Sequence, residues 1–350
     1  MPRKAEPPRL YLRPDDRTWI IRDRKHSERT GCTEGERDRA EIRLAEYLSK
    51  KHAARPAVGG KSDTISIAEV LRVYVIEHAP TVARPKLIAD HVIGLTDFWG
   101  TRMVSDIKGA TCRSFVASRS TPSVARHELE TLRAAVHHFH REYGLDPVPA
   151  FTLPPKHGSR ERWLTRQEAA RLLRAARKLP HMRRFILIAL YTGTRSGAVL
   201  KLSWMPSVTS GWLDLERGIL FRAGSAERKT AKRQPPVKLP PRLAAHLARW
   251  ARMDGSADYQ IRNVIHWNGS SVQSVKRAFR TAKNAAGLEG TVSPHVLRHS
   301  AATWLMQAGV EIWDAAGFLG MTVEVLTRVY GHHHANYQAS AATAIGSKRA

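Results

Sequence analysis

The sequence contains very little cysteine. Cys32 and Cys112 are the only two in 350 residues, and no C-x-x-C pair occurs. This excludes a disulfide-stabilised framework and a zinc site built from several thiolates. We therefore expect the fold to depend on hydrophobic cores for its stability. No metal or other cofactor is expected.

Long apolar runs are also absent. The longest, Phe185 to Tyr191, is far shorter than the roughly 20 residues that a transmembrane helix needs. The first residues, Met1 to Arg13, place basic side chains among prolines and hold no apolar segment of a secretory signal. We therefore expect a soluble protein of the cytoplasm with no membrane partner.

Acidic residues are scarce relative to basic ones. The chain has 57 Lys and Arg against 31 Asp and Glu, a formal net charge of +26. Such an excess attracts polyanions and supplies salt-dependent affinity for nucleic acid. An anionic membrane would attract it too, but no long helix pairs a basic face with a Trp/Phe/Leu face. Nucleic acid is therefore the expected partner, and charge alone leaves the chemistry open.

Residues 1–60 have the pattern of a small β-plus-helix module. Polar and apolar residues alternate from Arg9 to Thr33, with breaks at Pro14-Asp15-Asp16 and Thr30-Gly31, which predicts a small antiparallel sheet. Apolar residues then recur at helical spacing from Glu36 to Lys51. The module is basic, and both a contact with DNA and a merely solvated surface fit that composition.

Residues 61–150 have the pattern of a helical domain. The segment His52 to Ser62 contains proline and a glycine pair and predicts a linker. Four later segments repeat apolar residues at i, i+3 and i+4 and lack a strand pattern, so four helices are expected. A second proline-rich linker, Pro147 to Gly158, follows them.

Residues 151–350 are expected to be helical with a small inserted sheet. Thr165 and Glu168 have capping-box spacing, which predicts a helix beginning near Arg166. The other predicted elements are helices at 182–191, 241–252, 272–286 and 294–308 and strands at 212–215, 218–221 and 236–239. The Ala/Ser-rich end, 335–350, is expected to be a tail. The fold class is therefore mainly α with small antiparallel β-sheets (α+β).

Two helix boundaries carry residues that suit a phosphate. Arg195 follows the helix-ending Gly193 in Thr192-Gly193-Thr194-Arg195. His295 and Arg298 have a spacing of three at the start of another helix, where the amide dipoles favour an anion. His295 and His299 also have i, i+4 spacing, but no H-E-x-x-H glutamate or third ligand accompanies them, so a metal is not expected.

Two further patterns lie in a predicted turn and near the end of a predicted helix. A basic turn from Glu227 to Arg233 lies between two predicted strands, where it either projects a lysine into a groove or is simply solvated. Tyr330 lies near the end of an apolar helix, a place where aromatic packing is common. The histidines at 332–334 are consecutive, so their side chains diverge and cannot all face one ion.

Together and in this order, the four patterns resemble the catalytic signature of the tyrosine recombinases, the phage-integrase family. In that family an arginine follows T-G-x-R, a lysine lies on a β-hairpin, H-x-x-R opens a later helix, and L-G-H precedes the nucleophilic tyrosine. The matching positions here are Arg195, Lys229, His295, Arg298 and Tyr330, with Met321 in the place of the L-G-H histidine.

The resemblance implies a site-specific DNA recombinase, or integrase, that cleaves and rejoins DNA through a 3′-phosphotyrosyl intermediate. The two arginines would bind the phosphate as planar forks, and Lys229 would be the general acid. Arg228, Lys232 and Arg233 would bind DNA. Neither ATP nor a metal is needed for resealing, and the expected assembly is a homo-oligomer, a tetramer on paired DNA sites.

The resemblance also assigns roles to the three parts of the chain. Residues 1–60 are similar to an arm-binding module, residues 61–150 to a core-DNA-binding domain, and residues 151–350 to the catalytic domain with its tail. The sequence departs from the family pattern at Met321 and at Ala198, where a carboxylate usually steadies the first arginine. Two alternatives therefore stay open, a topoisomerase IB-like nicking-closing enzyme and a catalytically impaired DNA-binding relative.

Overall fold

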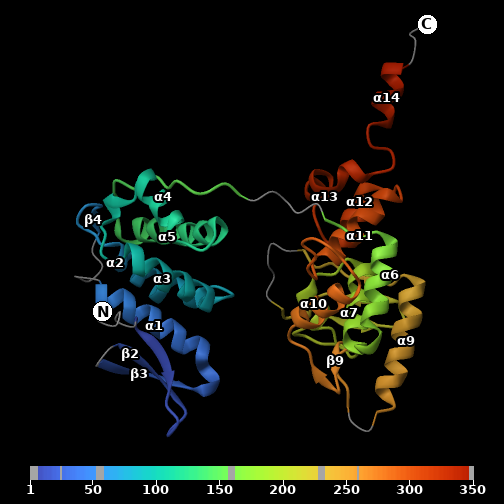
Figure 1. The fold of residues 1–350 in the computed structure, drawn as a ribbon, viewed down its shortest axis with the longest axis horizontal. Helices are drawn as coiled ribbons and strands as arrows, with labels where there is room; N and C mark the ends of the chain where they lie inside the picture. Colours follow the sequence, from blue (N-terminus) through green and yellow to red (C-terminus); the bar gives the residue numbers. More distant parts are fainter. Residues whose placement is uncertain are drawn as a thin grey trace. The chain divides into compact units, whose positions relative to one another are not determined.

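The computed structural model describes residues 7–23, 26–52, 59–156, 162–227, 233–257 and 260–346. The chain divides into two compact units, Met1–Gly158 and Ser159–Ala350, each with its own hydrophobic core (Figure 1). Both are built mainly from helices with small sheets, which confirms the predicted fold class. Within the described ranges, no helix is long and apolar enough to cross a membrane.

A three-stranded antiparallel sheet opens the first unit, as predicted. Its strands are β1 (Arg9–Leu12), β2 (Thr18–Asp23) and β3 (His26–Thr33), in the order β1-β2-β3. Helix α1 (Arg37–His52) follows and packs on the sheet, with Leu44 and Leu48 in contact with the buried Ile21. Alternation along the strands places Ile21 on the face that α1 covers.

Four helices form the rest of the first unit, as predicted: α2 (Ile67–Val73), α3 (Pro85–Trp99), α4 (Gly109–Ala117) and α5 (Pro122–Tyr143). A π-helical turn, Tyr74–His78, continues α2. Outside these four segments lies a strand pair that was not predicted, in which β4 (Gly60–Lys61) pairs in parallel with β5 (Leu145–Asp146). The pair is too short to leave an alternating pattern in the sequence.

Helix α1 joins the sheet to these four helices. Ala45 is fully buried in the same core as α2, α3 and α5, while Ile93 of α3 packs against the Ile21 cluster. Lys86, near the start of α3, forms an ion pair with Glu41 of α1. Figure 1 shows α1 lying between the sheet and α3. The sheet and the helical bundle therefore belong to one packed body.

The second unit contains the predicted helices and inserted sheet. Helix α6 begins at Arg166, where the side chain of Thr165 accepts from the amide of Glu168 and Glu168 bonds back to Thr165. The helices are α6 (Arg166–Ala175), α7 (Pro180–Thr192), α8 (Ser196–Leu200), α9 (Pro241–Gly255), α10 (Lys276–Ala285), α11 (Val296–Gln307), α12 (Ile312–Leu319) and α13 (Val323–Tyr330). The antiparallel sheet is β6 (Trp212–Asp214), β7 (Ile219–Phe221) and β8 (Val237–Lys238).

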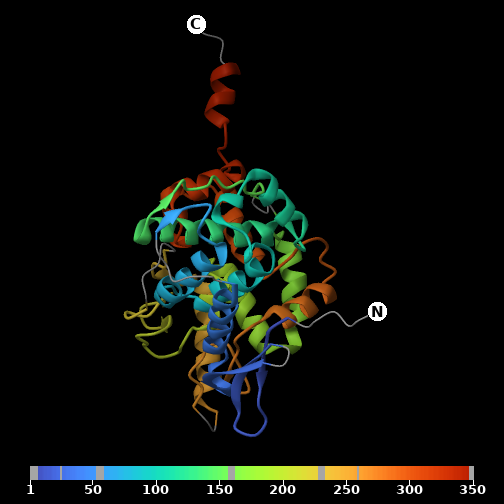
Figure 2. The same cartoon turned by 90° about the vertical axis from the view of Figure 1, so that its left-hand side faces the viewer.

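Several elements of this unit were not predicted, among them the short helices α8 and α12. A short hairpin joins β9 (His266–Trp267) to β10 (Ser270–Ser271). The expected tail contains a helix, α14 (Ala339–Gly346), whose described side chains are all exposed. Figures 1 and 2 both show α14 projecting away from the other helices of its unit. An apolar helix in that position has no surface of its own unit to cover it.

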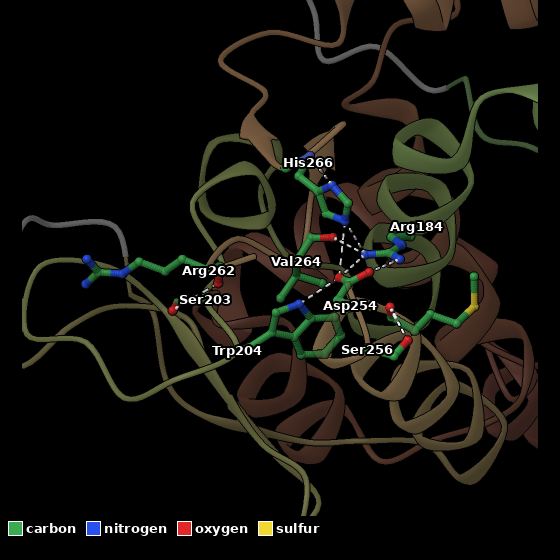
Figure 3. A network of polar contacts seen from close by, with 10 residues as sticks. Arg184, Ser203, Trp204, Asp254, Ser256, Arg262, Val264 and His266 are labelled. Atoms are coloured by element: carbon green, nitrogen blue, oxygen red, sulfur yellow. Dashed lines mark hydrogen bonds and ion pairs between the residues drawn. The ribbon is translucent and has the colours of Figure 1, made fainter. Parts of the chain in front are cut away.

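A buried ion pair joins helices α7 and α9 of the second unit (Figure 3). Arg184 of α7 and Asp254 of α9, each 6% exposed, are joined by two bonds of 2.6 and 2.7 Å. The indole of Trp204 donates to Asp254 at 2.9 Å, and His266 lies 3.2 Å from the same carboxylate oxygen. Arg184 also donates to the main-chain oxygen of Val264 at 3.0 Å. The network ties α7 and α9 to the loops around them.

Removing one partner of this network should destabilise the folded protein. We expect Asp254→Asn to lower the free energy of unfolding by about 3–5 kcal/mol, because Arg184 then stays buried without its counter-charge. The pair of the exposed Arg217 and the half-buried Asp214 provides the control, and Arg217→Gln should cost less than about 1 kcal/mol. Denaturant unfolding of the three proteins measures both values, and equal stability of the Asp254 variant and wild type would contradict the account.

The stability lost in the Asp254→Asn variant should depend on pH. Burial alone would raise the pKa of Asp254, but the bonds from Arg184 outweigh it and hold the pKa below the ordinary value of 3.8. The stabilisation is therefore complete above pH 3.8 and is lost as the pH falls through the lower pKa of the folded state. The stability gap between wild type and Asp254→Asn should narrow only in that acidic range.

Candidate active site

The first predicted arginine, Arg195, follows a tight turn at the end of α7. Gly193 ends that helix with a φ of +60°, in the left-handed region that favours glycine. A Cβ at Gly193 would lie 2.4 Å from Cδ2 of Leu319, so only glycine lets the turn approach α12 this closely. Arg195 then becomes the N-cap residue of α8, with its side chain half-buried.

The second predicted arginine, Arg298, lies in the first turn of α11 and is 5% exposed. Its Nη1 donates to the main-chain oxygen of Gly193 at 2.5 Å and to that of Leu319 at 2.6 Å. The predicted His295 is the exposed N-cap residue of the same helix, and its ring packs edge-on against His299 with centroids 4.7 Å apart. The H-x-x-R pattern therefore places a buried cation and an exposed imidazole at one helix start.

Arg195 is held by two other segments close to Arg298. Its Nη1 donates to the main-chain oxygen of Arg233 at 2.8 Å, and its Nη2 donates to that of Gly320 at 3.4 Å. Gly320 has a φ of +62°, and a Cβ there would lie 2.7 Å from Cδ of Pro235. The chain after α7, the chain before β8 and the end of α12 thus meet at one point, with an arginine between them.

A third arginine, Arg222, lies directly behind these two and was missed from the sequence. It follows β7, is 3% exposed, and its Nε donates to Oγ1 of Thr194 at 3.0 Å. Its remaining donors reach the main-chain oxygens of Pro235 at 2.9 Å, Thr192 at 2.8 Å and Phe318 at 2.7 Å. Arg222 therefore bonds all three segments that meet at the site. Arg222 belongs to no recognisable motif, and in so basic a chain a single arginine does not indicate a role.

The three guanidinium groups concentrate positive charge. Burial, then the charges of Arg298 and Arg195, lowers the pKa of Arg222 to about 9, and burial, then Arg195, lowers that of Arg298 to about 10. Burial also lowers the pKa of Arg195. All three stay protonated near pH 7, and among the described residues no carboxylate forms an ion pair with any of them. The site is thus suited to an anion.

Tyr330, the last residue of α13, lies beside this cluster and is 7% exposed. Its hydroxyl lies 2.6 Å from Nδ1 of His299. Burial raises the pKa of Tyr330 to about 12, an effect that the nearby charge of Arg298 partly offsets. The fold therefore brings Arg195, Arg298 and Tyr330 together from three distant parts of the chain.

Several predicted positions lie apart from this cluster or outside the described residues. Lys229, Arg228 and Lys232 fall within 228–232, which the structure does not describe. Arg233 has an exposed side chain whose charge lowers the pKa of Glu324, after larger effects from bonds to Thr322 and to its own main chain. Its main-chain oxygen, by contrast, is part of the site because it accepts from Arg195.

The two departures from the family pattern are occupied by small or apolar groups. Met321 is half-buried and packs against the cluster of α11, α12 and α13. Ala198 lies in α8 and is half-buried. Since neither side chain carries a hydrogen-bonding group, Arg195 depends on main-chain oxygens instead of a carboxylate for its position.

Arg222 allows a prediction about positioning. We expect Arg222→Lys to fold but to lose activity on the order of 10²-fold, because the three donors of one ammonium nitrogen cannot replace the four bonds that the planar guanidinium makes, and the other arginines then shift. The cleavage rate on a nicked duplex measures the activity, and DNA binding by the same variant should change much less. A variant that cleaves at the wild-type rate would show that the segments hold their positions without this residue.

Comparison with protein-family models gives one match to this part of the chain. The model described as the phage integrase family matches residues 162–337, half of the chain, and that range contains all the site residues named above. A tyrosine recombinase XerA from Thermococcus kodakarensis is 27% identical over 268 residues, which cover 74% of this chain and 92% of that protein. The integrase of Salmonella phage P22 is 27% identical over 232 residues, 63% of this chain and 56% of that one.

Solved structures share the fold. A fragment of the Tn1549 transposon integrase in complex with circular-intermediate DNA superposes with a TM-score of 0.65 at 16% identity, covering 81% of this chain and all of that one. A lambda integrase tetramer bound to a Holliday junction gives a TM-score of 0.56 at 18% identity, covering 91% of this chain and 97% of that one. At these identities the likeness concerns the fold.

Proposed function

The chain belongs to the phage integrase family and is a tyrosine recombinase that cleaves and rejoins DNA at specific sites, and we propose that Tyr330 is its nucleophile. Arg195 and Arg298 bind the scissile phosphate, and His295 assists from the exposed start of α11. The observation that carries the proposal is the convergence of the half-buried Arg195 and the buried Arg298 beside the buried Tyr330, with no carboxylate of the described residues paired to either arginine. No observation favours the topoisomerase IB-like or the inactive alternative.

The arginines suit the transition state of phosphoryl transfer. Negative charge builds on the non-bridging oxygens as the phosphorus is attacked, and fixed planar donors stabilise that charge better than solvent can. Each guanidinium is already oriented by main-chain oxygens, so little reorganisation is needed when DNA binds. This preorganisation is the main contribution of the fold to catalysis.

The reaction consists of two reversible exchanges. Oη of Tyr330 bonds to the phosphorus, the bond from phosphorus to the 5′ oxygen breaks, and the leaving oxygen takes a proton from Lys229, the proposed general acid. A 5′ hydroxyl from the partner duplex then attacks the phosphotyrosine and releases Tyr330. The phosphodiester energy is kept in the covalent link, so resealing requires no ATP or metal.

We propose that the acting form is a tetramer on two paired duplexes. Exchange between duplexes needs a nucleophile for each of four strands, and the exposed α14 offers a connection between copies. Ile345 of α14 is 89% exposed. A pocket of about 400 Å³ in the same unit is lined by Leu305, Phe318 and Trp313, the last 78% exposed. We place α14 of one copy in this pocket of the next.

The first unit supplies a DNA-binding face. Register pairs Arg9 with Arg22 and Ile20 with Arg29, so alternation places the three arginines on the face of the sheet opposite α1, and all three are exposed. Because α1 also packs on α3, we propose that the arm-binding-like module and the core-binding helices contact one continuous stretch of duplex. Arg228, Lys232 and Arg233 would contact DNA at the active site.

Replacing the three arginines together tests this face. We expect the triple variant Arg9→Gln, Arg22→Gln and Arg29→Gln to lower the slope of log affinity against log salt by about 3, because each lost phosphate contact lowers it by roughly 1. Footprinting should show lost protection at one edge of the core site. Arg17→Gln, whose side chain is paired with Glu34, is the control. An unchanged slope would exclude the face from DNA binding.

Strand exchange between two duplexes tests the proposed function. Wild-type protein is incubated with two duplexes of unequal length, taken from DNA flanking its own coding region, with one strand labelled. The proposal predicts hybrid strands of new length. It also predicts that a chain ending at Ala335, which lacks α14, still cleaves a nicked duplex but forms no hybrid. Relaxation of a plasmid without any hybrid strand would overturn the proposal in favour of the topoisomerase-like activity.

A further inference from the structure

The hydroxyl of Tyr330 is in direct polar contact with the ring of His299. Oη of Tyr330 lies 2.6 Å from Nδ1 of His299, and the two rings are 5.8 Å apart between centroids. His299 follows Arg298 directly in α11, so one helical turn carries both a phosphate-binding cation and an imidazole that faces the nucleophile. The roles assigned above do not use this imidazole.

The phenol needs a proton acceptor. Tyr330 is buried, and its pKa of about 12 keeps it neutral near pH 7. A neutral phenol is a weak nucleophile, and a positioned base with a pKa near the working pH activates it most effectively. Histidine is the side chain whose ordinary pKa meets that condition. The distance of 2.6 Å lies within the range for direct proton transfer.

Two titratable side chains among the described residues contact His299. They are Tyr330 of α13, at 2.6 Å, and His295 one turn earlier on α11, whose ring packs edge-on against that of His299. The cationic Arg298 precedes His299 directly in α11. In the tautomer with the ring proton on Nε2, Nδ1 of His299 accepts the phenolic hydrogen.

We propose that His299 is the general base that takes the phenolic proton of Tyr330 during strand cleavage and returns it on resealing. This inference rests on the proposed role of Tyr330 as nucleophile. As the bond from Oη to phosphorus forms, the proton moves to Nδ1 and His299 becomes an imidazolium. The bond to the 5′ oxygen breaks, and that oxygen is protonated by Lys229. In the reverse step the imidazolium protonates Oη as the tyrosine leaves.

The assignment separates His299 from His295. His295 is exposed at the start of α11, whereas His299 is half-buried against the phenol. His295 is therefore placed to contact phosphate, and His299 is placed to contact the nucleophile. The two histidines of the H-x-x-R-H segment thus act on different atoms.

The test uses a nicked duplex in two forms, one with the ordinary 5′ oxygen and one with sulfur at that position. Sulfur leaves without being protonated, so it removes the need for a general acid and leaves the need for a base. We expect His299→Gln to slow covalent-adduct formation by on the order of 10²-fold or more on both substrates. Lys229→Ala should be slow on the ordinary substrate and restored by sulfur. His246→Gln, at an exposed position of α9, is the control.

Two further readouts separate proton transfer from a structural role. Cleavage by His299→Gln should rise with pH above neutrality as hydroxide replaces the base, and added imidazole should restore activity to His299→Ala. A His299→Gln variant that cleaves at the wild-type rate, or one that sulfur restores, would overturn the proposal. Failure of wild-type protein to form an adduct at Tyr330 would instead overturn the proposed function beneath it.

Discussion

Arg298→Ala is expected to form covalent adduct with a nicked duplex 10²–10³-fold more slowly than wild type, a loss of roughly 3–4 kcal/mol in transition-state stabilisation. Arg298 is buried beside Tyr330, and its guanidinium is fixed by two main-chain oxygens. Removing it takes away an oriented cation at the place where phosphate charge develops. Single-turnover cleavage on a labelled strand measures the effect.

Controls separate this loss from binding and folding. Arg328 is an exposed arginine on the same helix as Tyr330, and Arg328→Ala should cleave at close to the wild-type rate. Arg298→Lys keeps the charge but not the planar fork, so its rate should lie between those of wild type and Arg298→Ala. If Arg298→Ala cleaved as fast as the Arg328 variant, Arg298 would have no role in the chemistry.

Tyr330→Phe is expected to abolish covalent adduct while DNA binding stays close to wild type. The phenyl ring fills the same buried space among α11, α12 and α13, and the change removes only the hydroxyl and its bond to His299. The free energy of unfolding should therefore change by no more than about 1 kcal/mol. Gel-shift affinity and denaturing-gel detection of the adduct measure the two properties.

The matched control for this change is Tyr337→Phe. Tyr337 lies shortly after the site and is 53% exposed. Its variant should form adduct at the wild-type rate. Adduct formation by Tyr330→Phe would mean that a different side chain attacks the phosphorus, and the proposed mechanism would then be wrong.

The residues of the site that could be predicted are those in local patterns. Arg195 follows a helix-ending glycine, Arg298 opens a helix three residues after His295, and Tyr330 ends a helix. Each pattern spans a few residues, so the sequence alone contains it. Their joint order indicated the family, and the fold places Arg195, Arg298 and Tyr330 in one cluster.

Arg222 and the acceptors around it could not be predicted. Its partners are the main-chain oxygens of Thr192, Pro235 and Phe318, which come from segments far apart in the sequence. Every residue type has such an oxygen, so no side-chain pattern marks it. The contact depends on how closely the three segments approach, and that distance is set by tertiary packing.

The packing of α1 on two sides was equally hidden. The sequence predicts an amphipathic helix from Glu36 to Lys51, and the structure has it at Arg37–His52. Leu44 and Leu48 cover the sheet, while Ala45 enters the core of α2, α3 and α5. A small residue such as alanine carries too little hydrophobic signal to reveal a second contact face. The division of the first unit into an arm-binding-like and a core-binding part stays a prediction.

In the proposed mechanism, Tyr330 becomes bonded to the 3′ phosphate of the cut strand. The most direct measurement traps the adduct on a nicked duplex, digests protein and DNA, and identifies the modified peptide by mass spectrometry. The account predicts a nucleotide linked through its 3′ phosphate to the peptide that contains Tyr330. A link at another residue, a link through a 5′ phosphate, or no link with protein that binds the same DNA would contradict it.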